Sequence, residues 1–235
     1  MAVAVFGSLG TGSGAVDPLD HNHVIAGEQS NVLLVAGTAV RSSRTVDEVR
    51  WDPTGANQLL VEAMEATGGT FTTALCHFKN PANQDGSTKT LRHDFDATAV
   101  ESTGAGLNFS GVDQTTPVKY PNSNVQTTGN PSVSVTTDAV SDDLVLDGIV
   151  KHCGGSGTIT QHASQALRWD LKDTTRPNHG GSTEAGGTNP TSMDWTFTGG
   201  DNNFCAAGML IKAAAAAPKS LPPISRITRN VLLRM

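Results

Sequence analysis

Apolar side chains along this chain occur in short runs, and residues that favour turns, chiefly Gly, Asn, Asp, Thr and Pro, separate the runs. The runs recur about every 8–15 residues, the spacing expected of a β-sandwich. Residues 132–136 alternate between hydroxyl side chains and Val, which is typical of a strand with one buried face. Residues 32–36 are apolar throughout and indicate a strand that is covered on both faces. The pattern therefore predicts an all-β protein.

The apolar runs define the strands that we expect. They lie at residues 3–6, 23–26, 32–40, 45–51, 59–66, 71–79, 95–100, 106–112, 132–137, 144–152, 158–161, 166–171, 193–198 and 204–212. Residues 58–66 also fit one turn or two of helix, because Leu59, Leu60, Ala63 and Met64 have helical spacing. Long polar loops are expected at 81–90, 114–131 and 173–191.

The composition changes at residue 213, where five alanines and Pro218 begin a segment that contains no acidic residue. We expect an N-terminal arm or first strand at 1–22, a jelly-roll (lectin-like) β-sandwich at 23–212, and a linker with a C-terminal assembly arm at 213–235. Net charge is unevenly divided between these parts. The whole chain carries −6, and four of its 16 Lys and Arg lie in the last segment, so the preceding body carries about −10. An acidic body argues against nucleic acid as the main partner.

The three cysteines, Cys76, Cys153 and Cys205, lie in expected strands without regular spacing, which is typical of reduced core residues. The first ten residues lack the basic segment and the apolar run of a signal peptide. No stretch reaches the roughly 18 apolar residues of a membrane span. We therefore expect synthesis and folding in a reducing cytoplasm.

Motifs of catalysis are incomplete in this sequence. Residues 10–15 match the GxGxxA dinucleotide pattern, but no amphipathic helix follows them. Glu62 and Glu65 lack the central Asp of a retaining glucanase motif, and Asp94 and Asp96 flank an apolar residue. No serine-hydrolase elbow and no phosphate-binding loop is complete. We expect a protein that is not an enzyme and needs no cofactor.

A few side chains bear on metal binding and on glycan binding. Asp17, Asp20, His21 and His23 lie within seven residues, and such side chains can converge on an ion. The adjacent pairs Cys76-His77 and His152-Cys153 point to opposite faces of their strands and fit a core cysteine beside a surface histidine better. A glycan platform would need exposed aromatic rings. Trp169 and Trp195 are expected in the core, whereas Trp51 has the position of an exposed ring beside a turn.

The C-terminal arm is the remaining candidate site. Pro222 and Pro223 favour an extended stretch, after which apolar residues recur at helical spacing and arginines fall beside them. The arm residues are Ile224, Arg226, Ile227, Arg229, Val231, Leu232 and Arg234. An isolated helix of this length is marginal in water, so the segment would become ordered on a partner. Docking on a neighbouring subunit and a solvated tail both remain open.

Several segments are similar to those of a known group of proteins. They are Asn31–Val35 after a His-x-Ile strand, Phe109–Pro117, Asp142–Leu146 and the closing strand Ala207–Lys212. Together they resemble the jelly-roll β-sandwich modules of tailed-phage virion proteins and of related bacterial proteins without an assigned function. The resemblance implies a lectin-like fold and a place on a particle surface or fibre, and it carries no catalytic residues.

The function expected from sequence is therefore structural. We expect a virion subunit of the capsid-decoration or fibre type, made in the host cytoplasm, whose partners are protein subunits contacted through the arm. The alternative is a carbohydrate- or cell-surface-binding module on the same fold.

Overall fold

The computed structural model is all-β. It describes residues 2–27, 29–41, 44–98, 101–126, 129–137, 142–151, 158–171, 177–187, 191–198 and 203–215, and these contain 17 strands and no helix. All strand pairs are antiparallel. The expectation of an all-β protein of sandwich type is confirmed.

The strands form two inner and two outer sheets. The first inner sheet has the order β1 (Ala4–Gly14), β9 (Ser102–Ser110), β3 (Leu33–Arg41), β7 (Phe71–Lys79), β6 (Val61–Gly68). The first outer sheet is β2 (Leu19–Val24), β8 (Thr88–Phe95), β4 (Val46–Trp51), β5 (Gln58–Leu59). The second inner sheet is β10 (Val118–Gln126), β17 (Phe204–Ile211), β12 (Leu144–Lys151), β15 (Asn178–Ala185), β14 (Ala166–Leu171). The second outer sheet is β11 (Ser132–Val135), β16 (Thr191–Thr198), β13 (Thr158–Gln161).

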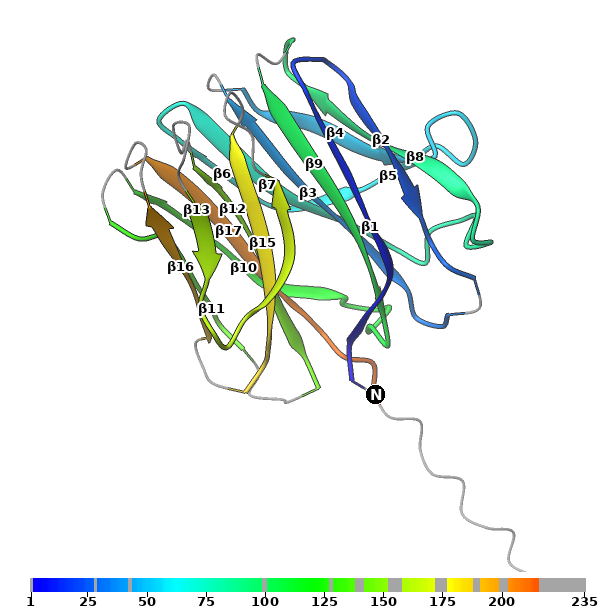
Figure 1. The fold of residues 1–235 in the computed structure, drawn as a ribbon. Coiled ribbons are helices and arrows are strands. Elements are labelled where there is room, and N and C mark those ends of the chain that lie inside the picture. Colours follow the sequence, from blue (N-terminus) through cyan, green and yellow to red (C-terminus); the bar gives the residue numbers. More distant parts are fainter. Residues whose placement is uncertain are drawn as a thin grey trace, which may run out of the picture.

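The four sheets stack as layers, with one apolar core between each neighbouring pair (Figure 1). Leu34, Trp51 and Leu91 fill the core between the first outer and first inner sheets. The central core combines residues of both inner sheets, and a third core lies behind the second inner sheet. The inner sheets are therefore covered on both faces, which explains why nearly every residue of β3, β9, β12 and β17 is buried.

The strand order repeats between the two halves of the chain, which we define as residues 4–110 and 118–211. Order β1-β9-β3-β7-β6 in the first inner sheet corresponds to order β10-β17-β12-β15-β14 in the second. Likewise, β2-β8-β4 in the first outer sheet corresponds to β11-β16-β13. Strand β5 has no counterpart among the described strands of the second half.

Irregularities in the ladders repeat at the same positions, which supports the correspondence. The first strand of each half bulges against the last one, opposite Leu107 in β9 and opposite Met209 in β17. Extra residues also interrupt the β6–β7 and β14–β15 ladders, at Ala63 and Arg168. Bulges re-aim side chains and are retained features of related sheets, so their agreement shows that both halves share one layout.

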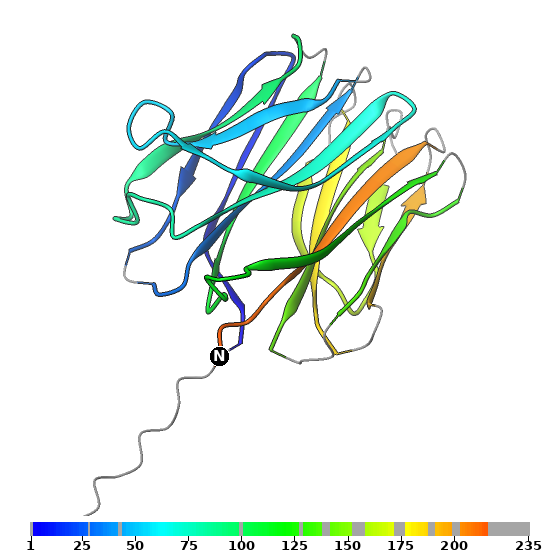
Figure 2. The ribbon, with the colours of Figure 1, turned by 180° about the vertical axis from the view of Figure 1, so that it is seen from behind.

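The two halves do not coincide with the parts of the chain that the sequence predicts. Residues 1–22, expected as an arm or first strand, contain β1 and most of β2, and both are hydrogen-bonded members of sheets. The body expected at 23–212 as one sandwich instead contributes to two, stacked through their inner sheets. The second view of the ribbon shows the two halves lying side by side (Figure 2).

Several strands differ from the sequence expectation. The helix alternative at 58–66 is wrong, because this segment forms β5 and β6. The expected loops at 114–131 and 173–191 contain β10 and β15, and β8 begins inside the expected loop at 81–90. β10 and β15 are rich in Asn, Ser, Thr and Gly, and β8 consists mostly of Thr, His and charged residues, so these strands lack the apolar pattern that marks a strand. Strands expected at 71–79, 158–161 and 166–171 match β7, β13 and β14.

The indole of Trp169 lies in the central core, where glycines from both halves make room for it. A Cβ atom on Gly37, in the first inner sheet, would lie 2.7 Å from Cζ2 of the indole. A Cβ on Gly181 would collide with the same ring, whereas one on Gly148 would lie 3.5 Å away. The ring is 2% exposed and meets His179 edge to face. This side chain thus joins β14 to the opposite sheet.

A series of alanine substitutions tests this packing. We expect Gly181→Ala to lower the free energy of unfolding by about 1–3 kcal/mol, because the new methyl group overpacks a rigid ring. Gly37→Ala should cost somewhat less, and Gly148→Ala least of all, since its nearest neighbour is the flexible side chain of Leu75. Urea unfolding measures the three values. Equal effects at Gly181 and Gly148 would contradict the position of the indole.

Candidate assembly surface at the base of the C-terminal segment

Three parts of the chain meet at one end of the molecule. The connection between the two halves, residues 111–117, runs beside residues 212–215, which follow β17. Val112 and Ala213 form a β-bridge, and Ala214 N–H donates to the Gly111 carbonyl at 2.8 Å. The beginning of the chain joins them, because Val3 N–H donates to the Asp142 carbonyl at 3.0 Å. We call this junction the anchor; it lies beside the N-terminus in Figure 1.

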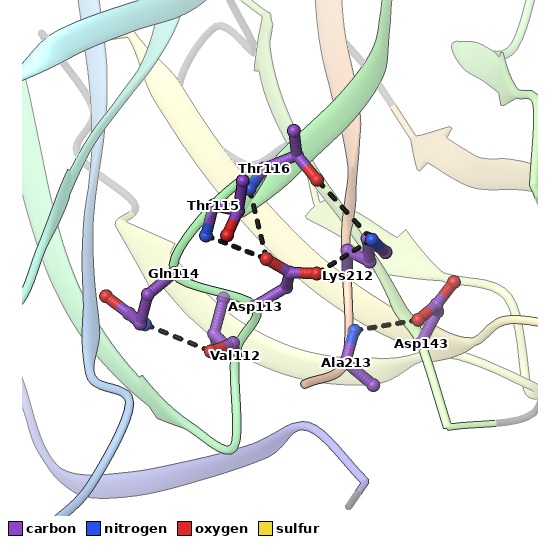
Figure 3. Close-up of polar contacts among 8 residues, drawn as sticks. All are labelled: Val112, Asp113, Gln114, Thr115, Thr116, Asp143, Lys212 and Ala213. Atoms are coloured by element: carbon purple, nitrogen blue, oxygen red, sulfur yellow. Dashed lines mark hydrogen bonds and ion pairs between the residues drawn. The ribbon is translucent and has the colours of Figure 1, made fainter. Parts of the chain in front are cut away.

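Asp113 is the centre of the anchor (Figure 3). One carboxylate oxygen accepts the backbone N–H groups of Thr115 at 2.7 Å and Thr116 at 3.1 Å. The other accepts a hydrogen bond from Nζ of Lys212 at 2.7 Å. The Lys212 ammonium, followed by the two N–H groups, lowers the pKa of Asp113 to about 2. An ionised carboxylate therefore holds the connection between the halves against the strand that leads to the C-terminal segment.

A second carboxylate fixes the same segment one residue later. Asp143, which is buried, accepts a hydrogen bond from Ala213 N–H at 2.7 Å. Its own carbonyl accepts Gly186 N–H at 2.9 Å, so the loop before β12 is held as well. The sequence segments that carry the resemblance to virion modules, 109–117, 142–146 and 207–212, thus meet here. Their polar residues have structural partners in this junction.

A cleft opens near the anchor, where the chain crosses from the first outer to the first inner sheet. Its volume is about 370 Å³ and it lies between β4, β5 and β6. The lining residues are Val46, Asp47, Glu48, Val49, Leu59, Leu60, Val61, Glu62 and Cys76. A second hollow of about 290 Å³ lies on the other side of Val61 and is lined by Val61, His77, Phe78, Lys79 and Pro117. Val61 thus lines both the cleft and the hollow, and Pro117, which belongs to the anchor, lines the hollow.

Apolar side chains are unusually exposed along this surface. Leu59 is 48% exposed and Val61 60%, although both lie on strands. Lys79 donates through Nζ to the Gln114 carbonyl at 3.0 Å and so ties β7 to the anchor. We call the cleft, the hollow and these two side chains the crossover surface. Exposed apolar patches bounded by polar groups are typical of contact sites.

The cleft of the crossover surface is acidic, whereas Lys79 and His77 line its hollow. Asp47, Glu48 and Glu62 line the cleft, and no Lys or Arg is among its lining residues. Glu48 is held by Arg50, whose hydrogen bonds lower the pKa of the Glu48 carboxyl. Burial raises the pKa of the Cys76 thiol at the floor, and the neighbouring Glu62 and Glu65 add to this effect. The thiol is therefore protonated and behaves as an apolar floor residue.

The four residues considered for a metal ion do not converge. Strand β2 places His21 and His23 on its inner face, whereas Asp20 points outward and pairs with Arg92 at 2.8 Å. Asp17 accepts the Phe95 N–H at 3.1 Å. Within the described ranges, no group of three or more His, Cys, Asp or Glu side chains is placed to hold a metal ion.

Buried histidines form ties between the layers that the sequence did not reveal. Nε2 of His21 lies 3.1 Å from Nε2 of His93, and Nδ1 of His93 lies 2.6 Å from the Thr38 hydroxyl. In the central core, the Thr103 hydroxyl lies 3.1 Å from Nδ1 of His179. Burial lowers the pKa of His21 to about 4 and of His179 to about 3, and it holds that of His93 well below its usual range. These rings are therefore neutral at pH 7.

One buried carboxylate occupies the core of the second half. Asp147 accepts Trp195 Nε1–H at 2.6 Å and both N–H and O–H of Ser182 at 2.8 Å. Burial raises its pKa to about 6, although these hydrogen bonds oppose the shift. The group is fully buried between two sheets, so its hydrogen bonds join layers and offer nothing to a solvent-borne ligand.

The remaining candidates from the sequence are cysteines, a histidine, tryptophans and the glycine motif, and each belongs to a strand or to the protein core. Cys76 and Cys205 are free and buried, and His77 is half-buried in the hollow. All three tryptophans are buried, so the expectation of an exposed Trp51 is wrong; its Nε1–H donates to the Ala82 carbonyl at 2.9 Å. The glycine motif at 10–15 lies mostly in β1, so no helix follows a turn there.

Two sets of candidates fall outside the residues that the structure describes. They are the His152-Cys153 pair and the arm residues Ile224, Arg226, Ile227, Arg229, Val231, Leu232 and Arg234.

Comparisons with protein-family models, with curated proteins and with solved structures give no match. A search of the described residues for a helix long and apolar enough to cross a membrane finds none.

The ion pair of the anchor is testable by substitution. We expect Asp113→Asn to lower the free energy of unfolding by about 1 kcal/mol, because it removes a charge-assisted hydrogen bond to Lys212. The contribution of Asp113 is present above pH about 3.8 and is lost as the pH falls through about 2, since its pKa is lowered on folding. Urea unfolding at pH 7 measures the effect. Asp85→Asn, at an exposed turn, is the control; equal losses would contradict the role of Asp113.

The buried histidines predict a loss of stability in acid. Their pKa values are lowered on folding, so their contribution is complete above pH about 6.5 and falls as the pH approaches 4 and then 3. Asp147 acts in the opposite direction, because a raised pKa favours folding as the pH falls through about 6. We expect the loss of stability from the histidines to exceed the gain from Asp147, since four histidines are buried and Asp147 is a single carboxylate.

Urea unfolding at pH 7.5 and pH 5 checks this expectation. The free energy of unfolding should be lower at pH 5, and His93→Gln should make the difference smaller because a titrating ring is removed. His162→Gln changes an exposed histidine and should leave the difference unchanged. A wild-type protein that is equally stable at both values would contradict the neutral, buried state of the rings.

Proposed function

We propose that this chain is a structural subunit of a phage particle, of the capsid-decoration or fibre type, that acts by assembly. Each half is proposed to be a jelly roll. The orders β1-β9-β3-β7 and β2-β8-β4-β5 support this, because they are the two four-stranded sheets that wrapping an antiparallel hairpin into two Greek keys produces. The second half repeats this order except for β5. The virion location rests on the resemblance of segments 31–35, 109–117, 142–146 and 207–212.

One observation carries the assembly proposal: the segment after β17 occupies the position of the connection after β9. Gly106 and Gly208 are equivalent, since each directly precedes the residue that lies opposite the bulge of the first strand. They pair with Ala36 of β3 and Asp147 of β12, which are therefore equivalent as well. Ser110 therefore corresponds to Lys212, and the connection that begins at Gly111 corresponds to the segment that begins at Ala213. In the first half this connection leads to another sandwich. The C-terminal segment is proposed to lead to another subunit in the same way.

The composition of the segment fits that role. Residues 219–235 carry four positive charges and no acidic side chain, whereas the rest of the chain is strongly acidic. Ile224, Ile227 and Val231 have the spacing of one helical face, which would be buried on a partner. Ordering such a segment on binding costs conformational entropy but leaves the stability of the free body unchanged.

A structural role also accounts for the perturbed titratable groups. Asp147, His93 and His179 are fully buried and join layers through hydrogen bonds or ring contacts. Glu65, one carboxylate of the incomplete glucanase motif, accepts the Val46 N–H at 3.0 Å and so has a structural partner. We infer that the chain is not an enzyme and needs no cofactor.

The assembly role predicts a change in mass on removal of the arm. We expect the full chain to form a defined oligomer and a chain that ends at Ala215 to be smaller, because that chain keeps the anchor residues 212–215 and lacks the arm. Sedimentation velocity measures the mass, and circular dichroism with urea unfolding checks that the body is unchanged.

Substitutions in the full chain separate the apolar stripe from the arm as a whole. Replacing Ile224, Ile227 and Val231 by Ser should reproduce the smaller mass, whereas replacing Ser225, Thr228 and Asn230 by Ala should not. If the full chain and the chain ending at Ala215 have the same mass at all concentrations, the proposal of self-assembly through the arm is wrong.

A further inference from the structure

We propose that the crossover surface of the first half is the receptor for the C-terminal segment, residues 219–235, of a neighbouring copy of this chain. The inference rests on the proposed assembly function and names the surface that the arm would contact.

The crossover surface lies where the two halves differ. In the first half the chain pairs with β4 through β5 and then joins the inner sheet as β6, which leaves the cleft between the two sheet edges. The second half has no described counterpart of β5, and β14 lies only in its inner sheet. The first half therefore carries a concave surface at this crossover, and Leu59 and Val61 are exposed along it.

The cleft and the segment carry opposite charges, although Arg50 pairs with Glu48 and Lys79 lines the neighbouring hollow. Asp47, Glu48 and Glu62 line the cleft without a basic residue, and Asp47 and Glu62 are exposed at its rim. The segment carries Lys219, Arg226, Arg229 and Arg234 and no acidic side chain. Apolar side chains of the segment would fill the cleft while its arginines approach the carboxylates. The cleft volume of about 370 Å³ is at the lower end of ligand pockets, and it suits a few aliphatic side chains.

The sequence after the anchor favours docking of the segment on a neighbouring copy over docking on its own molecule. The hollow is lined by Pro117, whose carbonyl accepts Lys212 N–H at 2.9 Å, so the surface begins close to the point where the segment leaves. Pro218, Pro222 and Pro223 favour an extended chain of about 3 Å per residue, which carries Ile224 about 20 Å away before the apolar stripe begins. A second copy related by symmetry presents its own surface to that stripe.

Two full-length variants test this docking by complementation. The cleft variant is Leu59→Ser with Val61→Ser, and the arm variant is Ile224→Ser with Ile227→Ser and Val231→Ser. Leu167→Ser with Val125→Ser is the matched control, because these residues are each 43% exposed on edge strands of the second half. Sedimentation velocity of each variant and of the 1:1 mixture gives the masses.

We expect each variant alone to self-associate at least about tenfold more weakly than the wild type and the control, because each lacks one partner of the contact. The mixture should form a heterodimer, since the intact arm of the cleft variant meets the intact cleft of the arm variant. Glu62→Arg should also weaken association, and Arg226→Glu with Arg229→Glu in the same chain should restore part of it.

The outcomes separate this inference from the assembly function. If the arm variant dissociates while the cleft variant assembles like the control, the arm assembles on another surface and only the docking proposal is overturned. If neither variant changes the mass of an oligomeric wild type, the assembly function through the arm is overturned as well. The wild type could also prove to be a monomer that does not bind a labelled 219–235 peptide, while the arm variant binds it. The segment would then dock within its own molecule, contrary to the proposal.

Discussion

The packing of the two inner sheets against each other is the constraint on which the rest of the structure depends. Each inner sheet already has an outer sheet on one face, so its other face must be covered by the other half of the chain. Trp169 crosses this boundary and fits only because Gly37 and Gly181 lack side chains beneath it. The apolar area buried in the central core is shared between the halves, which makes them one folding unit in spite of their separate strand orders. Neither half could expose its inner face to water without a large loss of stability.

The two halves share a backbone layout, but polar groups differ between their equivalent positions. Ala36 and Asp147 are equivalent, yet one is a small apolar residue and the other a carboxylate that binds Ser182 and Trp195. The same strand pairing and bulges thus occur with different side chains between the inner and the outer sheet. In the first half histidines from β2 and β8 share this space with an apolar core that includes Trp51, and in the second half Trp195 lies there among other apolar residues. The backbone layout is the common element, and the side chains tie each pair of layers in their own way.

Much of the fold could be predicted from sequence because most strands carry their own apolar signal. β3, β7, β12 and β17 were expected nearly at their observed bounds, since strands covered on both faces read as continuous apolar runs. β15 was not expected, because Gly180 and Gly181 lie beneath Trp195 and Trp169, so its core volume is supplied by other strands. β10 was missed because Asn122 and Asn124 bond to carbonyls of Ser134 and Ser132 and replace apolar contacts. The crossover surface depends on the order of strands, which no local pattern encodes.

The meeting of residues 2–3, the connection between the halves and residues 212–215 gives the molecule a polarity. Both chain ends leave the described body at one pole, beside the Asp113–Lys212 pair, while the turns between β1 and β2 and between β6 and β7 lie toward the other (Figures 1 and 2). A protein fused to either end would therefore sit at the same pole and leave the opposite one clear. For a chain tethered by its terminal segment, the orientation relative to the support is then decided by topology, and the far turns become the part that meets the surroundings.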